Sequence, residues 1–171
     1  MNGVTAQVIS TERLDLLPLR VEDAEEMAEV LSDPALHAYI GGTPDDAQAL
    51  RARYERMTAG SPDPAITWLN WVIRLRDEAR LTGTVQATVS PAGEERIAEI
   101  AWVVGSPWQG RGIAKEAARG LVEWLGRQGV QVVVAHVHPE HEASAAVAAA
   151  CGLAPTDIWH DGEVRWERTI G

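Results

Sequence analysis

The sequence contains one cysteine, Cys151, among its 171 residues. A disulfide within the chain is therefore excluded, which agrees with a reducing compartment. Cys151 follows an alanine-rich stretch and precedes a glycine, so we expect a small buried core residue rather than a covalent nucleophile. The first residues also lack the basic and apolar regions of a signal peptide, and we expect a cytoplasmic protein.

Long apolar runs and a surplus of positive charge are absent as well. No run approaches the ~20 apolar residues that a membrane span needs, so we expect no membrane association. The formal net charge is -10, which argues against a nucleic-acid binder, because contacts to phosphates require a basic surface. Acidity is compatible with a cationic substrate such as an amine, or with no more than a contribution to solubility.

The pattern of apolar residues predicts one α+β domain over residues 1–171, since neither a repeat nor a linker divides the chain. Apolar residues at helical spacing predict helices over 24–31 and 47–57. Segments rich in β-branched residues and tryptophan predict strands, and the short polar turns between the later ones favour antiparallel neighbours. These strands cover residues 11–19, 68–75, 81–89 and 97–104.

The second half of the chain predicts a parallel crossover followed by a hairpin. A helical face runs from Ala114 to near Gly129, and a continuous apolar strand follows over 130–137. Such a strand–helix–strand unit favours parallel pairing with a right-handed connection. A short helix is expected over 144–151. Asp161-Gly162 then separates two strand-like pieces, 156–160 and 163–169, which indicates a C-terminal β-hairpin.

The segment Gln-Gly-Arg-Gly-Ile-Ala at residues 109–114 joins a predicted strand to a predicted helix. Its glycines allow close approach of a ligand, and successive N–H groups at a helix start form an anion site. Arg111 and Lys115 add positive charge there. The loop lacks the Gly-Lys-Ser/Thr ending of a P-loop and the third glycine of a dinucleotide fingerprint. An ordinary turn that needs glycine only for its geometry is the alternative.

In this context the sequence resembles the GNAT superfamily of N-acetyltransferases. The superfamily signature, Gln/Arg-x-x-Gly-x-Gly/Ala, is met by Gln109, Gly112 and Ala114. The stretch 98–117 is similar to the branch that contains the ribosomal-protein N-terminal acetyltransferases. Thr-Glu-Arg-Leu at 11–14, the stretch 138–144 and Gly-Leu at 152–153 also resemble that branch. The resemblance extends over residues 11–166.

The resemblance implies a fold with splayed central strands and a site for acetyl-CoA. The strand that ends at Val103 and Val104 would diverge from strand 130–137, and the pantetheine arm would lie in the gap and bond to the backbone of these two valines. A further contact is implied at His141, where the family usually has an asparagine. The pyrophosphate would bind the loop amides of Gly110, Arg111, Gly112, Ile113 and Ala114.

Two residues are candidates for catalysis. An alkylammonium must lose a proton before it attacks a thioester, and Glu99 is our candidate base. Alternation places Glu99 on the same strand face as Ile97, Ala101 and Val103, where burial would favour proton uptake; a structural carboxylate paired with an arginine is the alternative. Ser144 matches a serine that sometimes protonates the leaving thiolate in the resembled branch, unless it only caps the short helix.

The sequence also contains His136-x-His138-x-x-His141, which is similar to part of a metallohydrolase signature. Carboxylate ligands are not marked, so we expect no metal. The predicted function is transfer of an acetyl group from acetyl-CoA to a primary amine, either a protein N-terminus or a small molecule, by direct transfer in a ternary complex. A non-catalytic acyl-CoA-binding domain is the alternative, and a homodimer is compatible with the sequence.

Overall fold

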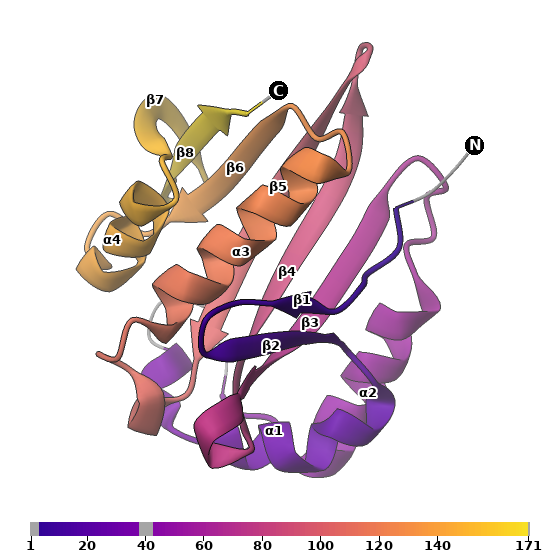
Figure 1. The fold of residues 1–171 in the computed structure, drawn as a ribbon, viewed down its shortest axis with the longest axis vertical. Helices are drawn as coiled ribbons and strands as arrows, with labels where there is room; N and C mark the ends of the chain where they lie inside the picture. The colour runs from indigo at the N-terminus through magenta and orange to yellow at the C-terminus, as the bar shows by residue number, and fades with distance from the viewer. Residues whose placement is uncertain (1–3, 38–42, 171) are drawn as a thin grey trace.

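A mixed eight-stranded sheet forms the centre of the computed structural model, which describes residues 4–37 and 43–170 (Figure 1). The strand order is β1-β2-β3-β4-β5-β6-β8-β7, and every pair of neighbours is antiparallel except β5 and β6. The strands are β1 (Ile9–Ser10), β2 (Leu14–Pro18), β3 (Thr67–Leu75), β4 (Arg80–Ala92), β5 (Glu95–Val104), β6 (Val132–Val137), β7 (Ala154–His160) and β8 (Glu163–Thr169).

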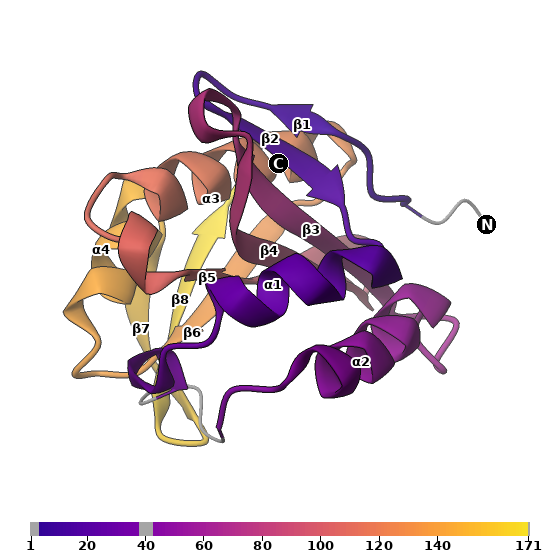
Figure 2. The ribbon, with the colours of Figure 1, turned by 90° about the horizontal axis from the view of Figure 1, so that it is seen from below.

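Helices cover both faces of the sheet (Figures 1 and 2). One face carries α1 (Ala24–Val30) and α2 (Ala47–Ala59), and the other carries α3 (Ile113–Arg127) and α4 (Glu142–Ala150). The short 3-10 helices are η1 (Val21–Asp23), η2 (Pro34–His37), η3 (Arg76–Glu78) and η4 (Ser106–Trp108). Within residues 4–37 and 43–170, no helix is both long enough and apolar enough to cross a membrane.

The buried stripe of α3 holds the core against the sheet. Ala117, Leu121 and Leu125 lie along one side of this helix and are each at most 1% exposed. Trp124 extends the stripe and meets Trp71 of β3 edge to face, with ring centroids 5.3 Å apart. Val85 of β4 lies opposite Trp71, and Trp102 of β5 lies opposite Val85. These side chains therefore point to the face of the sheet that α3 covers.

The central strands splay apart, as expected. The parallel pairing of β5 with β6 joins Ile97 to Val132, Ala98 to Val133 and Glu99 to Val134. Beyond Glu99 the ladder between the two strands ends, although β5 continues to Val104 and β6 to Val137. From Ile100 to Val104 the edge of β5 therefore has no ladder partner in β6, and this edge runs from Glu99 toward the loop at residues 109–114. We call this divergence of the two strands the gap.

The C-terminal hairpin is also confirmed. Asp161 and Gly162 have φ values of 50° and 81°, and a positive φ at both central residues is the mark of a type I′ turn. The hairpin places β8 beside β6 and leaves β7 at the edge of the sheet.

The expected strand over 11–19 was wrong in its first part. The chain instead forms a hairpin in which β1 pairs with β2 and residues 11–13 make the turn. Thr11 N–H donates to Leu14 O at 2.9 Å, and Arg76 donates to the carbonyl oxygens of Thr11 and Leu14, each at 2.6 Å. Contacts from a residue more than sixty positions away decide this turn, so local propensity did not reveal it.

Two glycines of α3 test how closely this hairpin packs on the helix. A Cβ at Gly120 would lie 2.8 Å from Thr11 Cγ2, whereas a Cβ at Gly126 would meet only Ile170 Cδ1 at 3.6 Å. Gly126→Ala should raise the free energy of unfolding by about 0.5–1 kcal/mol through helix propensity. Gly120→Ala should instead lower it by about 1–3 kcal/mol, because Thr11 must shift. Chemical denaturation of both variants checks this, and equal gains in stability would contradict it.

Candidate active site

The loop at residues 109–114 joins η4 to α3. Gly110 and Gly112 have φ values of 78° and 76°, a left-handed conformation that favours glycine. Gly112 is the N-cap of α3, so the first N–H groups of the helix have no intrahelical partner. The strand, loop and helix that the sequence predicts are thus present, with backbone donors of the kind that bind an anion.

Side chains around the loop hold it in place. Glu78 accepts a hydrogen bond from Trp108 Nε1 at 3.0 Å and forms an ion pair with Arg111, 2.7 Å between Oε2 and Nη1. These hydrogen bonds, from Arg111 first and Trp108 second, lower the pKa of Glu78. The Arg111 guanidinium is therefore engaged by a carboxylate. Lys115, exposed in the first turn of α3, remains as a cation beside the loop.

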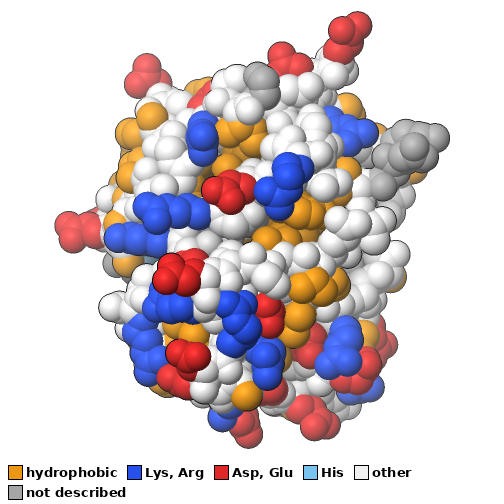
Figure 3. Space-filling model, in the orientation of Figure 1, with side chains coloured by type: hydrophobic (Ala, Val, Ile, Leu, Met, Phe, Trp, Pro, Cys, Tyr) orange, Lys and Arg blue, Asp and Glu red, His pale blue; other side chains and the backbone are white. Residues whose placement is uncertain are grey.

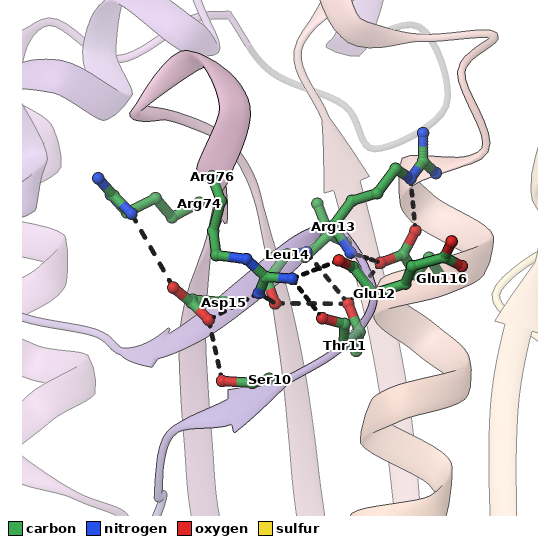
Figure 4. Close-up of polar contacts among 9 residues, drawn as sticks. All are labelled: Ser10, Thr11, Glu12, Arg13, Leu14, Asp15, Arg74, Arg76 and Glu116. Carbon is green, nitrogen blue, oxygen red and sulfur yellow. Dashed lines mark hydrogen bonds and ion pairs between the residues drawn. The ribbon is translucent and has the colours of Figure 1, made fainter.

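Glu116, in the first turn of α3, joins the N-terminal hairpin to the helix (Figure 4). Its carboxylate accepts hydrogen bonds from Thr11 Oγ1 at 2.5 Å and from the Arg13 N–H at 2.8 Å. It also pairs with Arg13 Nε at 2.7 Å. Burial opposes ionisation of Glu116, but the hydrogen bonds from Thr11 and Arg13 outweigh it and lower the pKa.

Arg13 also bonds to the loop at residues 109–114. Its Nη1 donates to Arg111 O at 2.9 Å, so the hairpin turn is bonded directly to the loop at residues 109–114. Figure 3 shows Lys and Arg side chains interspersed with Asp and Glu on the face that carries α3. Sequence reasoning missed Glu116 and Arg13 as site residues. The only signal was the likeness of residues 11–14 to the branch that contains the ribosomal-protein N-terminal acetyltransferases. That likeness assigned no role to these side chains.

The backbone of β5 alternates in direction beside the gap. Gly105 N–H donates to Thr82 O on β4 at 2.8 Å. Hydrogen-bonded and non-hydrogen-bonded pairs alternate in an antiparallel ladder, so Val103 also directs its backbone toward β4. Trp102 and Val104 direct theirs to the other side, toward the gap. The register therefore does not agree with our expectation that Val103 faces the gap through its backbone.

Gln109 and Val104 are brought together by the turn between them. Gln109 Nε2 donates to Val104 O at 3.0 Å. This bond occupies the Val104 carbonyl and leaves its N–H as the group of that residue that can serve a ligand in the gap. The signature glutamine thus fixes the end of β5 relative to the loop.

Glu99 lies at the point where β5 and β6 separate. As alternation predicts, it shares a face with Ala101 and Val103, and this is the face that α1 and α2 cover further along the strands. Our expectation that Glu99 is buried was wrong, since its side chain is 56% exposed. Glu99 is not among the described residues that line the cavity between the sheet and these helices, and its carboxylate is open to an incoming molecule. The alternative of an arginine partner is not observed among the described residues.

His136 is the partner of Glu99. Its Nδ1 lies 3.2 Å from Glu99 Oε2, and its side chain is only 15% exposed. The two groups are not hydrogen-bonded, so this buried nitrogen has a charged neighbour but no hydrogen-bond partner among the described residues. The ring of His160 lies 5.1 Å from that of His136. A carboxylate and two imidazoles therefore meet on this face.

Ser144 and His141 lie at the start of α4. The helix begins at Glu142, two residues before the expected start, so His141 and not Ser144 is its N-cap. Ser144 Oγ lies 3.5 Å from His141 Nε2. Burial first, and the neighbouring His138 second, lower the pKa of His141, which favours the neutral imidazole.

The histidine motif does not converge on one point. His136 faces Glu99, whereas His138 Nδ1 accepts a hydrogen bond from the Glu140 N–H at 3.1 Å. In the part of the chain that the structure describes, no three His, Cys, Asp or Glu side chains form a group that could hold a metal ion. Cys151 is 3% exposed, as expected of a core residue, and burial raises the pKa of its thiol to about 11.

Comparison with known families identifies this arrangement. The profile of the acetyltransferase (GNAT) domain matches residues 13–154. The chain belongs to the GNAT acetyltransferase family. The protein is therefore an acyltransferase enzyme. The resemblance to the GNAT superfamily, which the sequence of the loop at residues 109–114 suggested, is confirmed.

The GNAT acetyltransferase is similar to known proteins over most of its length. It is 26% identical over 140 residues to the uncharacterized N-acetyltransferase p20 of Bacillus licheniformis, with 81% of this chain and 77% of that protein covered. An acetyltransferase of this family from Bacillus anthracis superposes with a TM-score of 0.77 at 21% identity, covering 95% of this chain and 98% of the other. RimJ of Mycobacterium smegmatis, solved with CoA-disulfide, has a TM-score of 0.77 at 21% identity, with coverage of 95% and 87%. Both structures share the fold of this chain.

Glu116 should make the stability of the fold sensitive to acid. Because its folded pKa lies below the ordinary value of 4.5, the carboxylate stabilises the fold above that pH and loses its contribution as the pH falls through the folded pKa. Glu116→Gln should lower the free energy of unfolding at neutral pH by about 2–3 kcal/mol, since three donor groups lose a charged acceptor. The difference from the wild type should shrink as the pH falls below 4.5 and through the folded pKa. Denaturation over a pH series measures it.

Glu123→Gln, an exposed substitution two turns further along α3, is the matched control and should change stability by less than about 0.5 kcal/mol. A loss for Glu116→Gln that does not vary with pH, or an equal loss for Glu123→Gln, would contradict the assignment.

Proposed function

We propose that this enzyme transfers an acetyl group from acetyl-CoA directly to a primary amine while both substrates are bound. One observation carries the proposal: the pairing of β5 with β6 ends at Glu99, and the edge of β5 that is left without this partner runs on toward the loop at residues 109–114. A ligand in which an extended arm leaves a pyrophosphate fits both features at once. The pantetheine arm of coenzyme A leaves its pyrophosphate in this way.

The donor would be held mainly by backbone groups. The pyrophosphate accepts hydrogen bonds from the amides of residues 110–114, and Lys115 supplies a nearby charge. The pantetheine arm follows the gap beside Trp102 and Val104, whose backbone groups face it. The thioester then reaches the level of Ala101 and Glu99, where the strands begin to separate. His141 lies at the start of α4, directly after β6 ends, and is the proposed side-chain contact to the arm.

The acceptor is a protein N-terminus or a small-molecule amine that arrives as an ammonium ion. Glu99 takes one proton from it, and the freed amine attacks the thioester carbonyl carbon. The Trp102 N–H, which faces the gap next to Ala101, is the donor placed to stabilise the oxyanion. Collapse of the tetrahedral intermediate breaks the C–S bond. The attacking nitrogen gives up its second proton, and the leaving thiolate gains one, relayed through Ser144 or water. The products are the N-acetylated amine and coenzyme A.

His136 supports this role of Glu99. An exposed carboxylate samples several rotamers, and the imidazole 3.2 Å away favours the rotamer that faces the gap. The chain has a net charge of -10, which also favours approach of a cationic acceptor.

The proposal is tested by thiol release from acetyl-CoA over a panel of amines. Free coenzyme A should appear in proportion to N-acetylated product, and the buried Cys151 adds little background because burial raises the pKa of its thiol to about 11. Tight binding of coenzyme A without thiol release for any amine would contradict the proposal and favour the acyl-CoA-binding alternative.

Glu99→Gln should lower kcat/KM by about 100-fold, because general bases contribute on this scale. The affinity for coenzyme A should stay nearly unchanged. The pH range over which kcat/KM rises should shift, because without the base only the amine that has already lost its proton can react. Glu95→Gln is the matched control: this exposed residue lies on the same strand, at the β4–β5 turn. Unchanged turnover for Glu99→Gln, or an equal loss for Glu95→Gln, would contradict the assignment of the base.

A further inference from the structure

A cavity of about 190 Å³ lies between the sheet and helices α1 and α2. Its walls are mostly aliphatic, with Leu31, Leu50 and Met57 from the helical side. Thr84 and Gln86 of β4 form the floor. The cavity opens on the same sheet face as Glu99, so it lies on the side from which an acceptor must approach.

The floor of this cavity is next to the proposed reaction centre. Gln86 pairs with Ala101 on β5, and the following position on the same face pairs Thr88 with Glu99. Neighbouring strands are ~4.8 Å apart, and positions of the same face along a strand are ~7 Å apart. A group bound over Gln86 is therefore within the reach of one side chain from an amine at Glu99.

The described residues of the walls present no uncompensated charge. Asp45 and Arg53 line the cavity, and they form an ion pair with 2.9 Å between Oδ2 and Nη2. A charged ligand group would lose its hydration among these aliphatic side chains without gaining a partner. The cavity therefore favours a neutral occupant.

Tyr54 supplies one specific polar contact. It lines the cavity, is 3% exposed, and its hydroxyl has no hydrogen-bond partner among the described residues. Burial first, then the negative charges of Asp23 and Asp45, raise the pKa of Tyr54 to about 12, while Arg53 opposes them. The hydroxyl is therefore protonated and able to donate at neutral pH. Buried donors normally have an acceptor, so this hydroxyl is a candidate partner for an oxygen of a molecule that fills the cavity.

We propose that this cavity binds an uncharged, mainly aliphatic group of the acceptor amine, in which an oxygen accepts a hydrogen bond from Tyr54. The inference rests on the proposed function and narrows its substrate class. Amines with a neutral side chain close to the amino group belong to this class, among them a peptide N-terminus with a neutral first residue. Polycationic amines of the aminoglycoside type do not. A longer acyl chain on the donor would fill the cavity but leave the hydroxyl of Tyr54 unpaired.

The experiment measures kcat/KM for a series of amino-acid amides by thiol release. Norleucinamide and its ether isostere O-methylhomoserinamide are the neutral pair, and lysinamide and the α-amide of glutamate are the charged comparisons. The neutral amides should exceed both charged ones by about tenfold or more, the scale set by burying a charge without a partner. The ether should exceed norleucinamide by about fivefold, the scale of one hydrogen bond.

Tyr54→Phe removes only the hydroxyl. The variant should keep its thermal stability, because the hydroxyl makes no hydrogen bond within the described protein, and should keep the KM for acetyl-CoA. The preference for the ether over norleucinamide should disappear, while the preference for neutral over charged amides stays. A merely structural role for Tyr54 would lower turnover of both isosteres equally.

Other outcomes overturn the inference in distinguishable ways. Equal or higher kcat/KM for the charged amides would show that no neutral cavity selects the acceptor. A change for Tyr54→Phe in the choice among acetyl-, propionyl- and butyryl-CoA, instead of among amines, would assign the cavity to the donor. Absence of thiol release with every amine would overturn the proposed function and the inference with it, whereas turnover without side-chain preference would overturn the inference alone.

Discussion

The contact between Glu116 and the N-terminal hairpin is the interaction on which the site depends. A carboxylate in the first turn of α3 would oppose anion binding if it were free, because its charge lies beside the helix N-terminus. Here Thr11 and Arg13 satisfy it, and Arg13 continues to the carbonyl of Arg111. The Glu116 carboxylate thus closes the hairpin turn, and its pairing with Arg13 neutralises the negative charge at the start of α3. Arg13 in turn bonds the hairpin to the loop.

The second constraint is the missing pairing between β5 and β6. A sheet that diverges after Glu99 exposes backbone groups that a continuous ladder would use, and such groups need partners when they are covered. Gln109 meets one of these needs through the Val104 carbonyl. The remaining groups face the space in which we propose that the donor lies. The same divergence leaves Glu99 at the surface, so donor and acceptor can meet at the end of the ladder.

The sequence predicted the elements that rest on local chemistry. The hairpin at Asp161-Gly162, the parallel crossover and the glycine loop were all correct, because positive φ values and apolar periodicity are properties of a few adjacent residues. The position of Glu99 on its strand face was correct for the same reason. Its exposure was not, since that depends on where α1 and α2 end over the sheet. The hairpin of β1 and β2 was missed because Arg76 and Glu116 complete it from distant positions.

The sequence by itself therefore determined the family, the fold class and the glycine loop. Each follows from residue types at fixed short spacings, which folding cannot rearrange. Only the tertiary structure decided the partners: His136 beside Glu99, Glu78 on Arg111, and a neutral cavity with the buried hydroxyl of Tyr54. Such contacts join residues from separate elements, and they exist only when the packing of the helices on the sheet brings those elements together.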